Sequence, residues 1–307
     1  MGIRNFEELR SKVENGAKKR VAVVAAHDAH TLEAVFKAQE EGVLDYILLG
    51  RADEILRIAA KLGHTVRGED VLDCREDETA VRQGMELIRS GEADFLQKGL
   101  LQTSTLLKGV LNKEYGISTG KLISHVALLD IEKYHKIVGV TDGGMLLYPD
   151  LEQKKGIVKN AVDMFAGMGY EEPKVAAICA VEVRNPKMPE TVDAAELKKA
   201  AEAGEFGRCL LEGPISMDLA VNKESARIKG YDSPVCGETD IFLVPNISVG
   251  NIMVKSLLEF GNAMMAGCVV GAKCPIALNS RSAAFEEKYY SLMACAQMTG
   301  EQPLGNC

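Results

Sequence analysis

Short apolar runs rich in β-branched residues alternate with helical patterns along the whole chain. The runs lie at residues 21–26, 46–49, 95–96, 125–129, 137–140, 175–179, 209–211, 241–244, 269–271 and 276–278. Helical spacing of apolar residues occurs between them, at 31–40, 53–62, 78–89, 105–111, 151–165 and 194–203. Strands that are apolar throughout and separated by helices are typical of a mostly parallel sheet covered on both faces. The pattern therefore predicts an α/β protein.

The length and charge of the chain indicate the number of domains and exclude several functional classes. A chain of 307 residues is long enough for two domains rather than one. Its net charge of −8 argues against nucleic acid or an acidic membrane surface as a partner. Neither GxGxxG nor GxxxxGK[ST] follows the first strand, which argues against a Rossmann dehydrogenase and a P-loop kinase. At that position we expect Asp28 to cap the first helix instead.

Targeting and metal-binding patterns are missing from the sequence. No apolar run approaches the roughly 18 residues of a membrane span, and the N-terminus does not resemble a signal peptide. The eight cysteines are scattered without a CxxC pair, as expected of buried thiols in a reducing cytoplasm. Histidines do not cluster beyond His27 and His30. We therefore expect a cytoplasmic protein without a membrane partner or a metal site.

Two strand-to-helix junctions near the C-terminus carry small or polar residues. Pro245-Asn246 precedes one helix, and Asn279-Ser280-Arg281-Ser282 precedes the last one. Helix N-termini present free N–H groups and the positive end of the helix dipole, which suit an anion. Arg281 adds a guanidinium group that can bind phosphate with two hydrogen bonds. These junctions indicate an enzyme that handles an anionic, phosphorylated small molecule.

The order SPV…G…IF…P…GN…K followed by P…SR resembles the phosphate acetyl/butyryl-transferase family, and its butyryl branch more closely. The segments KGLLQTSTLLKGVL, ISHVALLDI and VTDGGMLLYPD stand in the order that this branch shows. The resemblance implies two α/β domains of the isocitrate-dehydrogenase-like (phosphotransacetylase) kind with a cleft between them. The first domain would comprise residues 1–123 and 275–307, and the second residues 124–274. We also expect a homo-oligomer, a dimer or larger.

The Ser280-Arg281 pair matches the active-site motif of that family. The resemblance implies that Ser280 donates a hydrogen bond to the developing oxyanion and that Arg281 holds phosphate. An acidic residue seven positions after the serine would accept a thiol proton, and here that position is Glu287, with Glu286 as an alternative. Without the resemblance, Ser280 could equally be a helix cap and Arg281 a surface residue.

A second candidate phosphate site is Thr103-Ser104-Thr105 with Lys108. We expect Thr103 and Ser104 to cap a helix over 106–111 and Lys108 to lie near the same helix end, where hydroxyl groups, free N–H groups and a cation would bind phosphate or coenzyme A (CoA). The acetyl branch resembles this arrangement with an arginine in place of Lys108. Lys98 is a weaker candidate cation for the same loop, and an N-cap beside a solvated lysine is the structural alternative.

The leading hypothesis is a phosphate acyltransferase that converts butyryl-CoA, or a similar short-chain acyl-CoA, and phosphate into acyl phosphate and CoA, reversibly. Direct attack in a ternary complex is favoured because neither an activated cysteine nor a Ser-His-Asp arrangement is evident. The substrates are CoA and phosphate, with no tightly bound cofactor. Alternatives are a phosphate acetyltransferase, a decarboxylating dehydrogenase, which lacks its expected aspartate cluster here, and a non-catalytic regulator that binds CoA or acyl phosphate.

Overall fold

The computed structural model describes residues 2–280 and 283–299 of the chain. It divides into two compact units. Unit 1 comprises Met1–Phe6 and Leu122–Met265, and unit 2 comprises Glu7–Lys121 and Ala266–Cys307. The boundaries lie at 121/122 and 265/266, whereas the sequence suggested 123/124 and 274/275.

Unit 2 is built on a twisted sheet whose strands follow the order β3-β2-β1-β4-β11-β10. The strands are β1 (Lys19–Val24), β2 (Leu44–Gly50), β3 (Val71–Asp73), β4 (Phe95–Lys98), β10 (Met264–Val270) and β11 (Ile276–Ala277). Neighbours pair in parallel from β3 through to β11, and only the described β10–β11 ladder of this unit is antiparallel. Residues 21–24 of β1 are completely buried, because helices cover both faces of the sheet.

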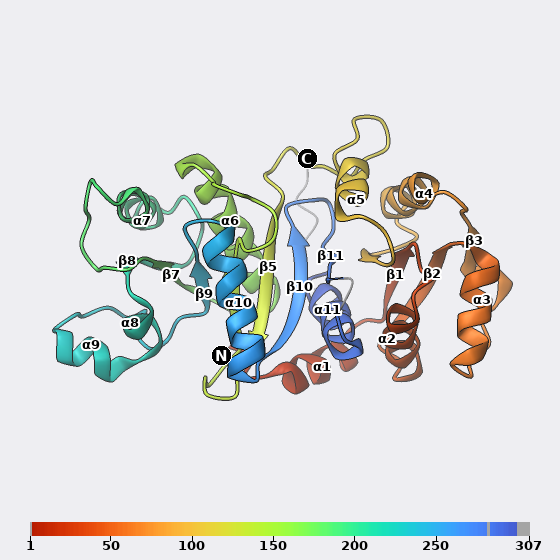
Figure 1. Ribbon diagram of the computed structural model, residues 1–307, viewed down its shortest axis with the longest axis horizontal. Coiled ribbons are helices and arrows are strands. Elements are labelled where there is room, and N and C mark those ends of the chain that lie inside the picture. The colour runs from red at the N-terminus through yellow and green to blue at the C-terminus, as the bar shows by residue number, and fades with distance from the viewer. Residues whose placement is uncertain (1, 281–282, 300–307) are drawn as a thin grey trace. The chain divides into compact units, whose positions relative to one another are not determined.

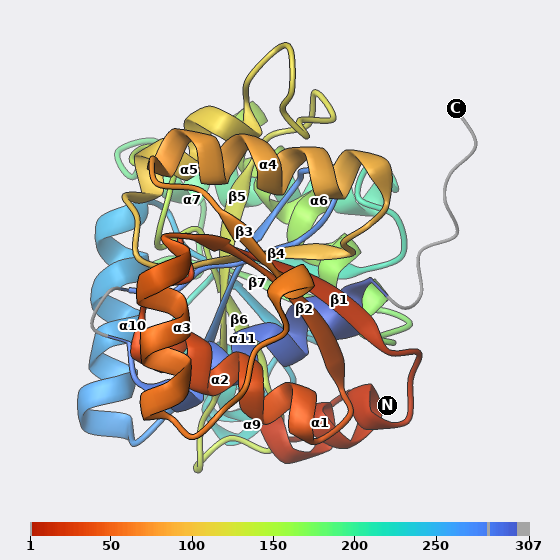
Figure 2. The ribbon, with the colours of Figure 1, turned by 90° about the vertical axis from the view of Figure 1, so that its right-hand side faces the viewer.

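The helices of unit 2 lie on the two faces of this sheet. They are α1 (Phe6–Glu14), α2 (Ala29–Glu40), α3 (Ala52–Lys61), α4 (Asp77–Ser90), α5 (Thr103–Val110) and α11 (Phe285–Met298), with a short 3₁₀ turn at Gly68–Asp70. Figures 1 and 2 show α4 and α5 on one face of the β1–β4 region and α2 and α3 on the other. Helix α11, which comes from the end of the chain, packs beside α2.

Unit 1 contains a second run of strands in the order β5-β6-β9-β7-β8. These are β5 (Ser124–Asp130), β6 (Val138–Thr141), β7 (Lys174–Ile178), β8 (Leu210–Ile215) and β9 (Ile241–Leu243). The β5–β6 pair is antiparallel and the other pairs are parallel. Its helices are α6 (Leu151–Gly167), α7 (Pro189–Glu202), α8 (Met217–Val221), α9 (Lys223–Lys229) and α10 (Ile247–Gly261). The central strand β9 is buried along its whole length.

The prediction of a mixed α/β fold with mostly parallel strands is confirmed. Two local predictions were less accurate. The last expected strands, at 269–271 and 276–278, form an antiparallel pair, a direction that apolar periodicity does not encode. Helix α5 begins at Thr103, earlier than the predicted 106–111. After β6 the chain turns at Asp142, whose carboxylate accepts hydrogen bonds from the N–H groups of Gly144 at 2.8 Å and Met145 at 2.7 Å.

Candidate active site

Three parallel strands of unit 2 end at the same edge of the sheet. Strand β4 pairs on one side with β1, where Val24 stands opposite Lys98, and on the other with β11, where Ala277 stands opposite Gln97. Beyond these ends, β1 leads to Asp28, β4 leads to Gly99, and β11 leads to Ser280. Ligands of open α/β sheets bind outside the carboxyl ends of the strands. The topology therefore brings three segments together that are far apart in the sequence.

These segments line a small hollow, here called the Ser280 hollow. Its lining residues come from the three strand ends and from the first turn of α11: Asp28, Lys98, Gly99, Leu100, Asn279, Ser280 and Lys288. Ser280 is exposed, whereas Lys98 and Lys288 are each only 5% exposed. Two buried ammonium groups therefore line the hollow against a single carboxylate, that of Asp28, in a protein whose overall charge is strongly negative.

Lys288 is held by residues at the start of α2. Its ammonium group donates to the Asp28 carboxylate and, at 2.9 Å, to Thr31 Oγ1. The Asp28 carboxylate also accepts from the Thr31 backbone N–H at 2.9 Å, so Asp28 caps α2 as the sequence predicted. Burial by itself would raise the pKa of Asp28, but the hydrogen bonds from Lys288 and Thr31 outweigh burial, and the pKa lies below its ordinary value of 3.8. Asp28 is therefore ionised at neutral pH and fixes the position of Lys288.

The backbone that follows β4 packs directly on the end of β1. Gly99 N–H donates to Val24 O, and Leu100 N–H donates to Ala25 O, both at 2.8 Å. A Cβ atom at Gly99 would lie 2.1 Å from Ala25 O, closer than any side chain can approach backbone. Only glycine fits at this position, and the close packing sets where Lys98 leaves the strand.

Asn279 connects the Ser280 segment to α11. Its Nδ2 donates to Ser291 Oγ at 2.9 Å and to the Glu287 carbonyl oxygen at 3.3 Å. Because a carbonyl can only accept, these contacts define the orientation of the amide. Within the described structure, the other amide atom, Asn279 Oδ1, is buried and has no hydrogen-bond partner. Arg281, the second residue of the predicted motif, lies outside the described residues.

Glu287 lies in the first turn of α11 and is half-buried. Burial raises its pKa above the ordinary value of 4.5, and the neighbouring Glu286 carboxylate adds to the increase. A carboxylate with a raised pKa is a better proton acceptor near neutral pH than an ordinary one. Glu286, the alternative base, is exposed on the same turn. Neither side chain is among those that line the Ser280 hollow.

The predicted arrangement of the Thr103 segment was wrong in two respects, the capping residue and the position of Lys108. Gln102 occupies the N-cap position of α5, so Thr103 and Ser104 are its first two helical residues and not its caps. Lys108 is exposed and lies in the last turn of this helix, not near its N-terminus. At a rise of 1.5 Å per residue, Lys108 stands about 7 Å along the axis from Thr103. Lys98, the weaker candidate from the sequence, lines the Ser280 hollow together with Lys288, whereas Lys108 does not.

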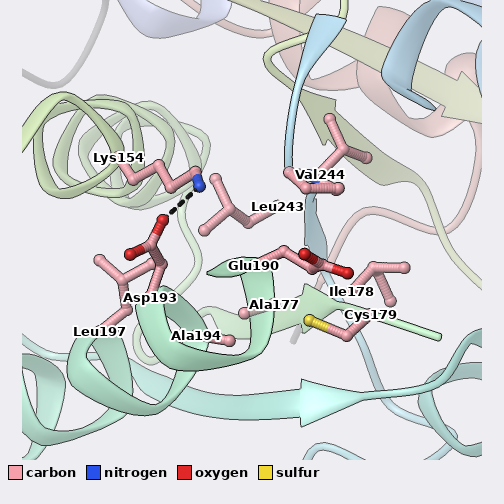
Figure 3. A pocket seen from close by; sticks show the side chains of 11 residues that line it. Lys154, Ala177, Ile178, Cys179, Glu190, Asp193, Ala194, Leu197, Leu243 and Val244 are labelled. Atoms are coloured by element: carbon pink, nitrogen blue, oxygen red, sulfur yellow. Dashed lines mark hydrogen bonds and ion pairs between the residues drawn. The ribbon is translucent and has the colours of Figure 1, made fainter. Parts of the chain in front are cut away.

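A second small hollow lies within unit 1 at the ends of β7 and β9 (Figure 3). It contains one buried ammonium group, that of Lys154, which donates to Asp193 at 2.6 Å. Glu190 adds a second carboxylate, and burial raises the pKa of the Cys179 thiol to about 12, so this thiol is protonated and not an activated nucleophile. The carboxylates outnumber the cation here, and the site does not suit an anion.

No other class of functional site emerges from the described residues. Residues 2–280 and 283–299 contain no group of three or more His, Cys, Asp or Glu side chains that could hold a metal ion. The seven cysteines in this part of the chain are free thiols. No helix among the described ones is long and apolar enough to cross a membrane.

Known proteins resemble this chain over nearly its whole length. Residues 73–296 match the family model described as phosphate acetyl/butaryl transferase. The phosphate butyryltransferase of Clostridium acetobutylicum is 42% identical, covering 98% of this chain and 100% of the relative. The chain belongs to this transferase family. A phosphate acetyltransferase of Thermotoga maritima is 38% identical over 95% of this chain and 99% of its own length. The crystal structure of a branched-chain phosphotransacylase from Enterococcus faecalis superimposes with a TM-score of 0.81 at 31% identity, over 92% of this chain and 100% of the other.

Sequence reasoning missed one residue that lines the Ser280 hollow, Lys288. It follows Phe285 by three positions and precedes Leu292 by four, so it lies on the apolar stripe of α11. A lysine at a position that faces the core is unusual, because burial of an ammonium group requires a partner. That mismatch was the available signal, but the partner, Asp28, is 260 residues away and periodicity does not reveal it.

The network around Asp28 makes a prediction about stability. Because the folded pKa of Asp28 is lowered, its stabilising effect is fully present above the ordinary value of 3.8 and is lost as the pH falls through the folded value. Asp28→Asn, which can still cap α2, should lower the free energy of unfolding at pH 7 by about 3 kcal/mol. The difference from wild type should begin to shrink below about pH 4, where the Asp28 carboxylate of the unfolded chain becomes protonated, and should vanish as the pH falls through the lower pKa of the folded state. Urea unfolding at pH 7, 5 and 3.5 measures this, and a pH-independent difference would contradict it.

Proposed function

We propose that this chain transfers a short-chain acyl group, preferably butyryl, between CoA and inorganic phosphate. The observation that carries the proposal is the Ser280 hollow, in which the serine of the family motif and two buried ammonium groups meet. An oxygen of phosphate would attack the thioester carbonyl carbon, the C–S bond would break, and CoA would leave as thiolate or thiol. Acyl phosphate and CoA are the products, and the reverse reaction retraces these steps.

Each candidate residue has a distinct role in this proposal. The Ser280 hydroxyl group donates to the carbonyl oxygen as negative charge develops on it. Arg281, adjacent in sequence, holds the phosphate through paired hydrogen bonds. In the reverse direction Glu287 accepts the proton of the CoA thiol, a role that its raised pKa favours over the exposed Glu286. Catalysis by direct attack needs no covalent enzyme intermediate.

In this proposal the start of α5 binds another phosphate group of the substrates. Thr103 and Ser104 place two hydroxyl groups beside the free N–H groups of the helix N-terminus, an arrangement suited to a phosphate group of CoA or to phosphate itself. Lys108 has no part in the arrangement because it lies in the last turn. CoA and phosphate act as substrates without a tightly bound cofactor, and the reaction takes place in the cytoplasm.

We also infer a homo-oligomer, from the outer face of α10. Large apolar side chains are exposed there and just beyond the helix end: Val249, Ile252, Phe260 and Met264, with Phe260 91% exposed. Exposed apolar clusters of this kind mark protein–protein interfaces. A second copy of the chain is the partner that this proposal names.

The oligomer can be tested by charge substitution on α10. Ile252→Asp combined with Phe260→Asp should shift the molar mass measured by light scattering to that of a 33.2 kDa monomer, because burial of two carboxylates in an interface is costly. Leu56→Asp changes an exposed apolar side chain on α3, in unit 2 and away from α10, so it serves as the control and should leave the mass unchanged. A wild-type protein that is itself monomeric would refute the inference.

The substrate class is tested by thiol release from acyl-CoA on addition of phosphate. Butyryl-CoA should exceed acetyl-CoA in kcat/KM by roughly tenfold or more, because each of two additional buried CH₂ groups contributes about 0.8 kcal/mol. The reaction should depend on phosphate and persist in EDTA. If acetyl-CoA is used equally well or better, the protein is a phosphate acetyltransferase. If no acyl-CoA releases thiol, the protein is a non-catalytic binding protein.

Ser280 is tested by separating catalysis from folding. Ser280→Ala should lower kcat by about 10²-fold with little change in either KM, because a hydrogen bond to the oxyanion strengthens only in the transition state. If Ser280 served only the local structure, the variant would lose at most about 1 kcal/mol of stability and keep its kinetics. Melting temperature and steady-state kinetics of the same preparation distinguish these results.

A further inference from the structure

Ala25 adopts a backbone conformation that alanine rarely takes. It follows the last residue of β1 directly, and its φ of 57° lies in the left-handed region. Among the residues that the structure describes, the other positive φ values belong to glycines and to Asn262, which ends α10 in a conformation that asparagine tolerates. A left-handed alanine is disfavoured by a factor of roughly 5–30 in population. Strained backbone of this kind is concentrated at functional sites.

The bend at Ala25 is held by hydrogen bonds to both neighbouring strands. The Ala25 carbonyl oxygen accepts from Leu100 N–H at 2.8 Å, just beyond β4, and Ala26 N–H donates to Leu49 O of β2 at 2.9 Å. Ala25 and Ala26 are completely buried. Because buried backbone groups are costly to leave unpaired, these bonds hold the bend against its strain.

Glycines on both sides leave room for the bend. At Gly50, the last residue of β2, an added Cβ atom would lie 3.2 Å from Ala26 N and 2.9 Å from His27 Nδ1. At Gly99, just after β4, it would lie 2.1 Å from Ala25 O. Both neighbouring segments therefore approach the end of β1 too closely for a side chain. Alanine, and not glycine, occupies the strained position between them.

The bend connects two of the segments that line the Ser280 hollow. Asp28 follows Ala25 by three residues and holds Lys288, and the Gly99-Leu100 turn is bonded to the end of β1. Each residue has only two soft backbone dihedrals, so a change of φ at Ala25 would redirect the chain that leads to Asp28. Ala25 is not itself a lining residue and acts on the site only through these neighbours.

We propose that the left-handed bend at Ala25 positions Asp28 and the Gly99-Leu100 turn for acyl transfer, and that Ala25 is a positioning residue of the transferase site. The inference rests on the proposed function, since it assigns a role in that reaction. A displacement of reacting groups by about 1 Å can lower a rate by about 10²-fold. The strained conformation is kept because it holds the end of β1 within that tolerance.

Glycine substitutions measure the strain. Ala25→Gly and Ala22→Gly each remove one completely buried methyl group, but Ala22 lies within β1 and has no positive φ. Glycine adopts a φ of 57° without a steric penalty, so only Ala25→Gly relieves strain. The melting temperature should therefore fall less for Ala25→Gly than for Ala22→Gly, by about 3 °C or more. Equal losses would show an unstrained bend and would overturn the inference.

Valine substitutions test the role in the reaction. A β-branched residue strongly disfavours positive φ, so Ala25→Val should disturb the bend. It should lower kcat for thiol release from butyryl-CoA by about 10²-fold and change each KM by less than about threefold. Ala25→Gly, which preserves the bend, should retain most of kcat. Ala22→Val adds the same two methyl groups within the strand and is the matched control, which should also retain kcat.

Gly50→Ala disturbs the bend without changing Ala25, and it replaces Ala25→Val if that variant does not fold. The added Cβ atom presses on Ala26 N from the β2 side, and Gly50 does not line the hollow. Folded Gly50→Ala should lower kcat by about tenfold or more with little change in either KM.

The kinetic results can also overturn the inference. If folded Ala25→Val or Gly50→Ala keeps the wild-type kcat, or if Ala22→Val lowers kcat as much as Ala25→Val does, the bend does not position the site. Thiol release by wild type is measured first. If wild type releases no thiol, the proposed function fails, and the glycine variants still decide whether Ala25 is strained. If wild type releases thiol but one of the contrary results is found, only the positioning role is lost.

Discussion

The parallel pairing of β4 with β1 on one side and β11 on the other is the constraint on which the site depends. Parallel neighbours end at the same edge of a sheet, so three chain segments that begin at residues 25, 99 and 278 must leave it together. The backbone bonds from Gly99 and Leu100 to the end of β1 then bring the β4 turn so close that no side chain fits at Gly99. Backbone geometry, before any charged group is considered, fixes where a ligand can bind.

Electrostatics then distinguishes the Ser280 hollow from the hollow at the ends of β7 and β9, and the comparison that follows concerns these two alone. Each contains a buried lysine paired with an aspartate, but the Ser280 hollow adds a second lysine, whereas the hollow of unit 1 adds a glutamate. Burial of an ammonium group is costly without a partner, and both pairs satisfy that requirement. The excess of one charge decides the kind of ligand, and only the Ser280 hollow carries an excess of positive charge. In a protein with a net charge of −8, anion binding must be a local property.

The ion pair between Lys288 and Asp28 also links the stability of the fold to the candidate site. Lys288 connects α11, from the end of the chain, to the start of α2, and Asn279 connects the Ser280 segment to α11. Two side chains that line the candidate site are thereby held by hydrogen bonds to Thr31 and Ser291, which are not among its lining residues. Such support keeps a site within the narrow geometry that catalysis needs. It also explains why substitutions here must be judged by folding and by kinetics together.

The sequence by itself determined what depends on local pattern. Apolar runs between helices predicted the parallel α/β fold, Asp28 was recognised as a helix cap, and the strand-to-helix junction at Ser280 was identified as a site for an anion. The family resemblance assigned Glu287, whose backbone carbonyl accepts from Asn279 but whose side chain is not among those that line the hollow. Only the tertiary structure decided which strand ends meet, that Lys108 lies at the wrong end of α5, and that Lys288 reaches Asp28 across 260 residues. The physical reason is that periodicity records which face of an element is buried, whereas partners far apart in the chain are chosen by strand order and packing.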